Sequence, residues 1–82
     1  MVKITFSDEF QNLISKSKDP LIKEKIEKVL LKIRDNPEIG KPMRYSRKGT
    51  REVYIGSFRL SYSYNKNSGV VFVLDLYHKD KQ

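Results

Sequence analysis

Several residue types that small domains use to hold a cofactor or reinforce a fold are scarce in this sequence. Its 82 residues include no cysteine and one histidine, so neither disulfides nor thiolate metal sites are available. The four glycines are scattered and form no phosphate-binding loop. Because the sequence also has no regular cluster of carboxylates, we expect no metal and no cofactor. A chain of this length fits one domain, 1–82, with a modest core.

Long apolar runs are missing as well. The N-terminal residues MVKITF are followed by polar ones before a signal peptide could form, and no later stretch approaches the length that crosses a membrane. The lack of cysteine fits a reducing compartment. We therefore expect a cytoplasmic protein with no membrane partner.

Basic residues are in excess, and the excess lies in one half of the chain. The formal net charge is +7. Residues 1–40 hold 8 basic and 7 acidic residues, whereas residues 41–82 hold 9 basic and 3 acidic residues. This asymmetry indicates that the second half meets an acidic partner, such as nucleic acid, an anionic membrane or an acidic protein. The alternative is a charge that only keeps the protein in solution.

The first half carries one strand and two helices. Apolar residues alternate over 2–6, which predicts a half-buried strand. Ser7 is a good N-cap for a short helix, and Asp19-Pro20 begins a second helix. The apolar stripe of the second helix is formed by Ile22, Ile26, Val29, Leu30 and Ile33. Asn36-Pro37 ends it, so the two helices form a hairpin suited to pack on a sheet.

The second half has the period of strands. We expect a basic loop and three strands, at 41–51, 51–55, 58–64 and 70–74. Gly56-Ser57 forms a tight turn, the last strand is buried on both faces, and the tail from Tyr77 leaves the sheet. The order β-α-α-β-β-β predicts an α+β fold, with the helical hairpin packed on a small, mostly antiparallel sheet.

The candidate functional residues are cations that the antiparallel strands bring together. Five of them lie in an acid-free stretch of 11 residues: Lys41, Arg44, Arg47, Lys48 and Arg51. Arg59 alternates with apolar neighbours, so it must emerge on the solvent side of the sheet, and His78 and Lys79 should lie near that face. Such a surface suits RNA, because cations meet phosphates and tyrosines offer surfaces for unstacked bases.

The same groups suit RNA cleavage. Attack of a 2′-hydroxyl on the adjacent phosphate requires one proton to leave and another to reach the 5′-oxygen, and histidine titrates in the right range for this. Guanidinium and ammonium groups stabilise the charged phosphorane without a metal. The alternatives are that His78 is an ordinary surface residue, that Arg59 pairs with Glu52, and that Tyr62 and Tyr64 only pack in the sheet.

The order of short motifs resembles the RelE/ParE toxin superfamily. Lys41-Pro42-Met43 precedes a Gly-x-Arg-Glu strand at 49–52, a turn, and an aromatic-Arg-aliphatic-x-Tyr strand at 58–62. The valine-rich last strand and the closing Tyr77-His78-Lys79-Asp80 also fit. The β-α-α-β-β-β order is similar along the whole chain.

This resemblance implies the toxin of a type II toxin–antitoxin pair. RelE-like members cut messenger RNA in the ribosomal A site without a metal, and a neighbouring antitoxin blocks the basic groove. The resemblance implies that Arg59 is the mid-strand arginine that contacts the scissile phosphate. It matches Arg51 to a basic residue at the start of the preceding strand, and His78 and Lys79 to the C-terminal His/Arg pair of relatives. We expect His78 to transfer protons and Arg59 with Lys79 to stabilise the phosphorane. The RNA-binding set is Lys41, Arg44, Arg47, Lys48 and Tyr54, in which Arg47 and Lys48 hold flanking phosphates.

The sequence also departs from the family pattern. Many RelE-like toxins carry a catalytic tyrosine several residues beyond the His/Arg pair, and no tyrosine follows His78-Lys79 here. Strand alternation is expected to turn Tyr77 away from His78, so we do not expect Tyr77 to replace it. Position 54 is Tyr where relatives often carry Arg. Two alternatives stay open, a ParE-like poison of DNA gyrase and a non-catalytic nucleic-acid-binding module. His78 with Lys79 favours the nuclease, because gyrase poisoning requires no proton-transfer group.

Overall fold

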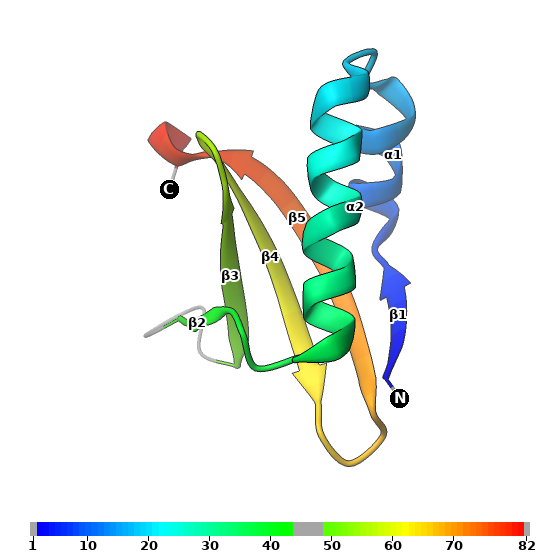
Figure 1. The fold of residues 1–82 in the computed structure, drawn as a ribbon. Coiled ribbons are helices and arrows are strands. Elements are labelled where there is room, and N and C mark those ends of the chain that lie inside the picture. Colours follow the sequence, from blue (N-terminus) through cyan, green and yellow to red (C-terminus); the bar gives the residue numbers. More distant parts are fainter. Residues whose placement is uncertain (1, 44–48, 82) are drawn as a thin grey trace.

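Two helices pack on one face of a five-stranded sheet in the computed structural model, which describes residues 2–43 and 49–81 (Figure 1). The elements are β1 (Lys3–Phe6), α1 (Asp8–Lys16), α2 (Pro20–Asp35), β2 (Lys41–Pro42), β3 (Thr50–Ile55), β4 (Phe58–Asn65) and β5 (Val70–His78), with a final 3₁₀ turn at Lys79–Lys81. The predicted α+β class and helical hairpin are confirmed.

The sheet has the strand order β1-β5-β4-β3-β2. β1 runs parallel to β5, while the other neighbours are antiparallel. The sheet is therefore mixed, with one parallel pair at its edge. β2 lies within the stretch that the sequence predicted as loop, because a two-residue edge strand leaves almost no periodic signal.

Both helices begin at the residues that the sequence indicated. The Ser7 hydroxyl accepts a hydrogen bond from the backbone N–H of Phe10, and the Asp19 carboxylate accepts one from Leu21. Ser7 also donates to the carbonyl oxygen of Leu74 in β5. Ser7 therefore both caps α1 and ties the start of the helix to β5.

The core lies between the helices and the sheet. Its buried members come from both layers: Phe10, Ile26, Ile33, Ile55, Leu60, Tyr62, Val71 and Val73. Tyr62 is completely buried, and its hydroxyl donates to the carbonyl oxygen of Pro37 and accepts from the N–H of Gly40. The interpretation of Tyr62 as a packing residue is confirmed.

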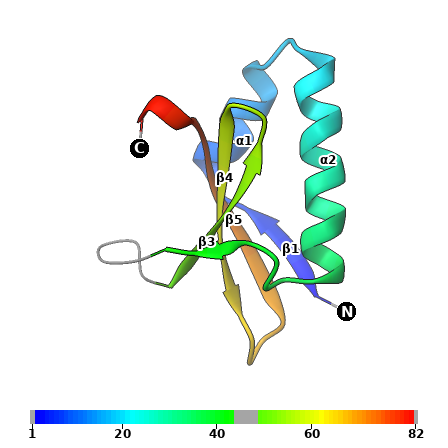
Figure 2. The same cartoon turned by 60° about the vertical axis from the view of Figure 1, so that its left-hand side comes forward.

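Neither α1 nor α2 lies on the opposite face of the sheet (Figure 2). The sequence predicted that 70–74 is buried on both faces, and this was wrong. Val71 and Val73 are buried, but Phe72 between them is 40% exposed, because both helices pack on the same side. The uncovered face is the side of the sheet that bears Glu52, Tyr54, Arg59 and Phe72.

No helix within the described ranges combines the length and the apolar character that crossing a membrane requires.

Candidate functional site

Arg59 lies on the uncovered face, as the sequence predicted. Residues directly opposite in antiparallel strands point to the same side of a sheet. Arg59 pairs with Tyr54 in β3 and with Tyr77 in β5, whereas its neighbour Leu60 pairs with Val53 and is fully buried. The alternation of β4 therefore separates the arginine from the core.

The guanidinium of Arg59 is held in place by its neighbours. Its central carbon lies 3.8 Å from the ring centroid of Tyr54, and Nη1 donates to the carbonyl oxygens of Phe58 (3.0 Å) and Gly56 (3.3 Å). Nε is buried without an acceptor, the one such side-chain nitrogen or oxygen among the described residues. The head group is thus fixed by stacking and backbone carbonyls.

A β-bulge decides which residues near the end of β5 share this face. β4 and β5 pair Tyr62 with Val73 but Ser61 with Asp75, so Leu74 is an extra residue. One extra residue reverses the side of every residue beyond it. Tyr77 therefore lies on the uncovered face, and His78 lies on the helix-covered face.

The expectation that the side chain of His78 lies near the uncovered face is therefore wrong. His78 pairs with Phe58, and their rings meet edge to face with centroids 5.5 Å apart. Its Nδ1 lies 3.4 Å from the carboxylate of Asp80 and accepts a hydrogen bond from the backbone nitrogen of Asp80 at 3.3 Å. The strand also runs to His78, so the tail leaves the sheet after His78 rather than at Tyr77 as predicted.

Tyr77 contributes a group that the sequence reasoning set aside. Its hydroxyl donates a hydrogen bond to Oε2 of Glu52, which is 4% exposed. Glu52, offered by the sequence as a partner for Arg59, is thus engaged by a tyrosine two strands away. The uncovered face brings together Arg59, Tyr54, Tyr77 and Glu52.

Arg51 does not join this group. It pairs with the buried Tyr62, so its side chain leaves the sheet on the helix-covered side. Nη1 of Arg51 donates to the carbonyl oxygens of Glu38 (3.0 Å) and Gly40 (2.8 Å). These bonds hold the segment between α2 and β2, which gives Arg51 a structural part in the fold.

Of the remaining candidates, the structure describes Lys41 and Lys79. Lys41 is exposed and pairs with Glu52, which places it on that side of β2. Lys79 is exposed at the start of the 3₁₀ turn, fixed by its N–H bond to the carbonyl oxygen of Ser57. Arg44, Arg47 and Lys48 lie outside the described residues.

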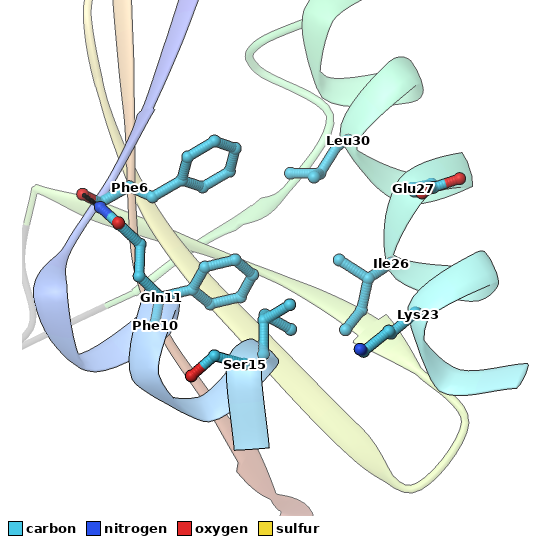
Figure 3. A pocket seen from close by; sticks show the side chains of 9 residues that line it. Phe6, Phe10, Gln11, Ser15, Lys23, Ile26, Glu27 and Leu30 are labelled. Atoms are coloured by element: carbon cyan, nitrogen blue, oxygen red, sulfur yellow. Dashed lines mark hydrogen bonds between the residues drawn. The ribbon is translucent and has the colours of Figure 1, made fainter. Parts of the chain in front are cut away.

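An apolar cavity of about 420 Å³ lies elsewhere, between α1, the end of β1 and α2. Figure 3 shows Phe6 and Phe10 facing Ile26 and Leu30 across it, with Lys23 and Glu27 on α2. This cavity offers apolar surface and no pair of cations that would bind phosphate. Within the part of the chain that the structure describes, no cluster of three or more metal-binding side chains occurs.

A family model described as the ParE toxin of the type II toxin-antitoxin system parDE matches residues 4–82. The chain belongs to this family. It is a toxin of a type II toxin–antitoxin system, within the RelE/ParE superfamily. No curated protein matches its sequence significantly.

Solved structures share the fold of this ParE-family toxin. A chain of the RelBE2 toxin–antitoxin complex from Mycobacterium tuberculosis matches with a TM-score of 0.81 at 22% identity, over 94% of this chain and 96% of that one. A chain of the intact RelBE complex of E. coli matches with a TM-score of 0.81 at 19% identity, over 95% of this chain and 96% of that one. The YoeB/ParE toxin from Agrobacterium tumefaciens matches with a TM-score of 0.81 at 14% identity, over 94% of this chain and 98% of that one. At these identities the matches establish the fold alone.

Proposed function

We propose that this toxin is an endoribonuclease that cuts messenger RNA in the ribosomal A site and so inhibits translation. The observation that carries the proposal is the fixed guanidinium of Arg59 on the uncovered face, stacked on an exposed tyrosine. A cation held in place before the substrate arrives stabilises developing charge without reorganisation during the reaction.

The surroundings of Arg59 suit a phosphate group. Its Nε–H has no acceptor, and a buried donor left unpaired costs about 1–3 kcal/mol. A small shift of the side chain toward a phosphate oxygen would relieve that cost. Arginine also binds phosphate through two parallel N–H bonds, which fixes its orientation. We assign the scissile phosphate to Arg59 and charge stabilisation to Arg59 with Lys79.

Tyr54 suits an unstacked base. Its side chain is 57% exposed although it lies on a strand, and the guanidinium covers one side of its ring. Single-stranded RNA is commonly recognised by stacking splayed bases on such aromatic rings. Lys41, together with Arg44, Arg47 and Lys48 from the sequence, would neutralise flanking phosphates.

An antitoxin is the second partner in this proposal. The similar structures from Mycobacterium tuberculosis and E. coli are complexes of a toxin with its antitoxin. An antitoxin that covered the uncovered face would block Arg59 and Tyr54 directly. An acidic contact segment would match the charge of residues 41–82, which carry 9 basic and 3 acidic residues.

A ParE-like action on DNA gyrase is the second candidate. The family model that matches the chain is that of ParE toxins. His78 was the residue that favoured the nuclease in the sequence, and it lies on the opposite face from Arg59. A gyrase poison would need no proton-transfer group, so this placement removes one objection to it.

One set of reactions separates these functions. Purified toxin is added to messenger RNA with and without programmed ribosomes, new RNA ends are located by primer extension, and gyrase supercoiling is assayed in parallel. The nuclease proposal expects new ends inside the A-site codon, only with ribosomes, and normal supercoiling. Intact RNA with inhibited gyrase would replace it by the ParE action, and no effect in either assay would leave simple RNA binding.

A further inference from the structure

The geometry points to Tyr77 as the group that accepts the proton from the attacking 2′-hydroxyl, with Glu52 behind it as the final proton acceptor. This inference rests on the proposed RNA cleavage and names residues that perform it. The three observations behind it are the face on which Tyr77 lies, its bond to Glu52, and the burial of that carboxylate.

The face comes from the bulge in β5. Because Leu74 is an extra residue between Val73 and Asp75, Tyr77 is directly opposite Arg59 and on the same side. Side chains in such a cross-strand position have Cβ atoms about 4.5–5.5 Å apart. A phosphate bound at Arg59 therefore has the hydroxyl-bearing ring of Tyr77 on one side and Tyr54 on the other. His78 faces the opposite side of the sheet.

The bond to Glu52 crosses the middle strand. Tyr77 lies in β5 and Glu52 in β3, and the residue of β4 between Glu52 and Asp75 is Ser61. A serine leaves room above β4 for the ring of Tyr77 to reach Oε2 of Glu52. A larger side chain at position 61 would occupy that path.

The difference in burial between Glu52 and Tyr77 indicates which of them meets the substrate. Glu52 is 4% exposed, so a substrate cannot reach its carboxylate directly. Tyr77 is half-buried, so it is more accessible than the carboxylate to which its hydroxyl donates. The tyrosine oxygen is thus the atom that meets the 2′-hydroxyl, and the carboxylate acts through it.

The step balances without a metal or a histidine. The 2′-oxygen forms a bond to phosphorus as its proton passes to the oxygen of Tyr77, and the tyrosine proton passes to Glu52. Arg59 and Lys79 stabilise the phosphorane. The bond from phosphorus to the 5′-oxygen then breaks, that oxygen takes a proton from water, and a 2′,3′-cyclic phosphate remains. General acid–base groups of this kind contribute about 10²–10⁴-fold to a rate.

The experiment compares single-turnover cleavage of ribosome-bound messenger RNA by wild-type toxin and by Tyr77→Phe. The matched control is Tyr64→Phe, which removes a hydroxyl on the helix-covered face of β4. We expect Tyr77→Phe to lower the rate at least about 100-fold, as general-base loss should, with RNA affinity changed less than about 2-fold and Tyr64→Phe near wild type. Glu52→Gln should lower the rate similarly, while Glu52→Asp restores part of it.

A second substrate distinguishes base from acid. A 5′-bridging sulfur at the scissile linkage makes a leaving group that needs no proton. The defect of Tyr77→Phe should persist on this substrate, whereas a rescued rate would overturn the inference by making Tyr77 the acid. Wild-type activity in Tyr77→Phe, or a loss of activity confined to His78→Gln, would also overturn it. In these cases the wild-type protein still cuts RNA, whereas an inactive wild-type protein would refute the proposed function itself.

Discussion

Arg51 and Arg59 lie on neighbouring strands, but their side chains point to opposite faces of the sheet and make different contacts. Arg51 points to the helix-covered side and donates to two backbone carbonyls of the segment after α2. Arg59 points to the uncovered face, where its guanidinium is stacked on Tyr54 and its Nε lacks an acceptor. The same side chain thus stabilises the fold on one face and is available to a ligand on the other. The face of the sheet, more than the residue type, separates structure from function in this toxin.

The largest expected effect on stability tests this division within β4. Leu60 is fully buried and Ser61, the next residue, is on the uncovered face. Leu60→Ala should lower the free energy of unfolding by about 2–5 kcal/mol, because it leaves a cavity in the core. Ser61→Ala should change it by less than about 0.5 kcal/mol. Urea unfolding followed by circular dichroism measures both, and equal losses would contradict the two-face description.

The second-largest loss of stability is expected from a substitution of Tyr62. Tyr62→Phe removes the hydroxyl that accepts from the Gly40 N–H and donates to the Pro37 carbonyl. Leaving these backbone groups unpaired should cost about 1–3 kcal/mol. Tyr64→Phe is the control and should stay within about 0.5 kcal/mol of wild type. Thermal unfolding of the two variants under identical conditions makes the comparison, and a Tyr62→Phe protein as stable as the control would refute it.

Titration of the same hydroxyl should make the stability difference between wild type and Tyr62→Phe depend on pH in the alkaline range. Burial raises the pKa of Tyr62 above its usual value. A group whose pKa is raised by folding contributes stability below its unfolded pKa, here about 10, and loses it as pH rises through the folded value. The difference between wild type and Tyr62→Phe should therefore shrink above about pH 10.

Arg51→Ala should have a moderate effect. It removes two charge-assisted hydrogen bonds at a partly exposed position, so we expect a loss of about 1–2 kcal/mol. Arg51→Lys should restore only part of the loss, because one ammonium group does not reproduce the planar fork of arginine. Chemical unfolding of the three proteins tests the order, and an unchanged stability in Arg51→Ala would remove its structural part.

The smallest effect is expected at the surface ion pair of Lys66 and Glu38. The Lys66 ammonium lies 3.1 Å from the Glu38 carboxylate and lowers the pKa of that carboxyl. The stabilisation is therefore present above the usual carboxyl pKa and is lost as pH falls through the folded value. Lys66→Ala should move the pKa of Glu38 up in an NMR titration while leaving the unfolding temperature almost unchanged. An unmoved titration would show that the pair does not form in solution.

The parts of this fold that sequence reasoning predicted are those that depend on near neighbours. Ser7 and Asp19-Pro20 begin helices because a cap needs only residues two or three positions away. The alternation of β4 likewise placed Arg59 correctly, since it needs only one strand. The family resemblance agreed with the matching family model along almost the whole chain.

The site beyond Arg59 could not be predicted in the same way. Strict alternation from Val71 and Val73 would have placed His78 on the uncovered face. The bulge at Leu74 reverses this, and it depends on how β5 pairs with β4, a relation that no local pattern in 70–78 shows. The bond between Tyr77 and Glu52 spans 25 positions and follows from the same pairing. A long-range register therefore changed which side chains share the site.

The most direct test of this account is the cleavage rate of ribosome-bound messenger RNA by Arg59→Ala and Arg51→Ala, each first shown to be folded. We expect Arg59→Ala to lose about 10²–10³-fold in rate, as removal of a group that stabilises transition-state charge does, and Arg51→Ala to keep most of the activity. Arg59→Ala cutting as fast as wild type, or Arg51→Ala losing as much as Arg59→Ala, would contradict the assignment of function to the uncovered face.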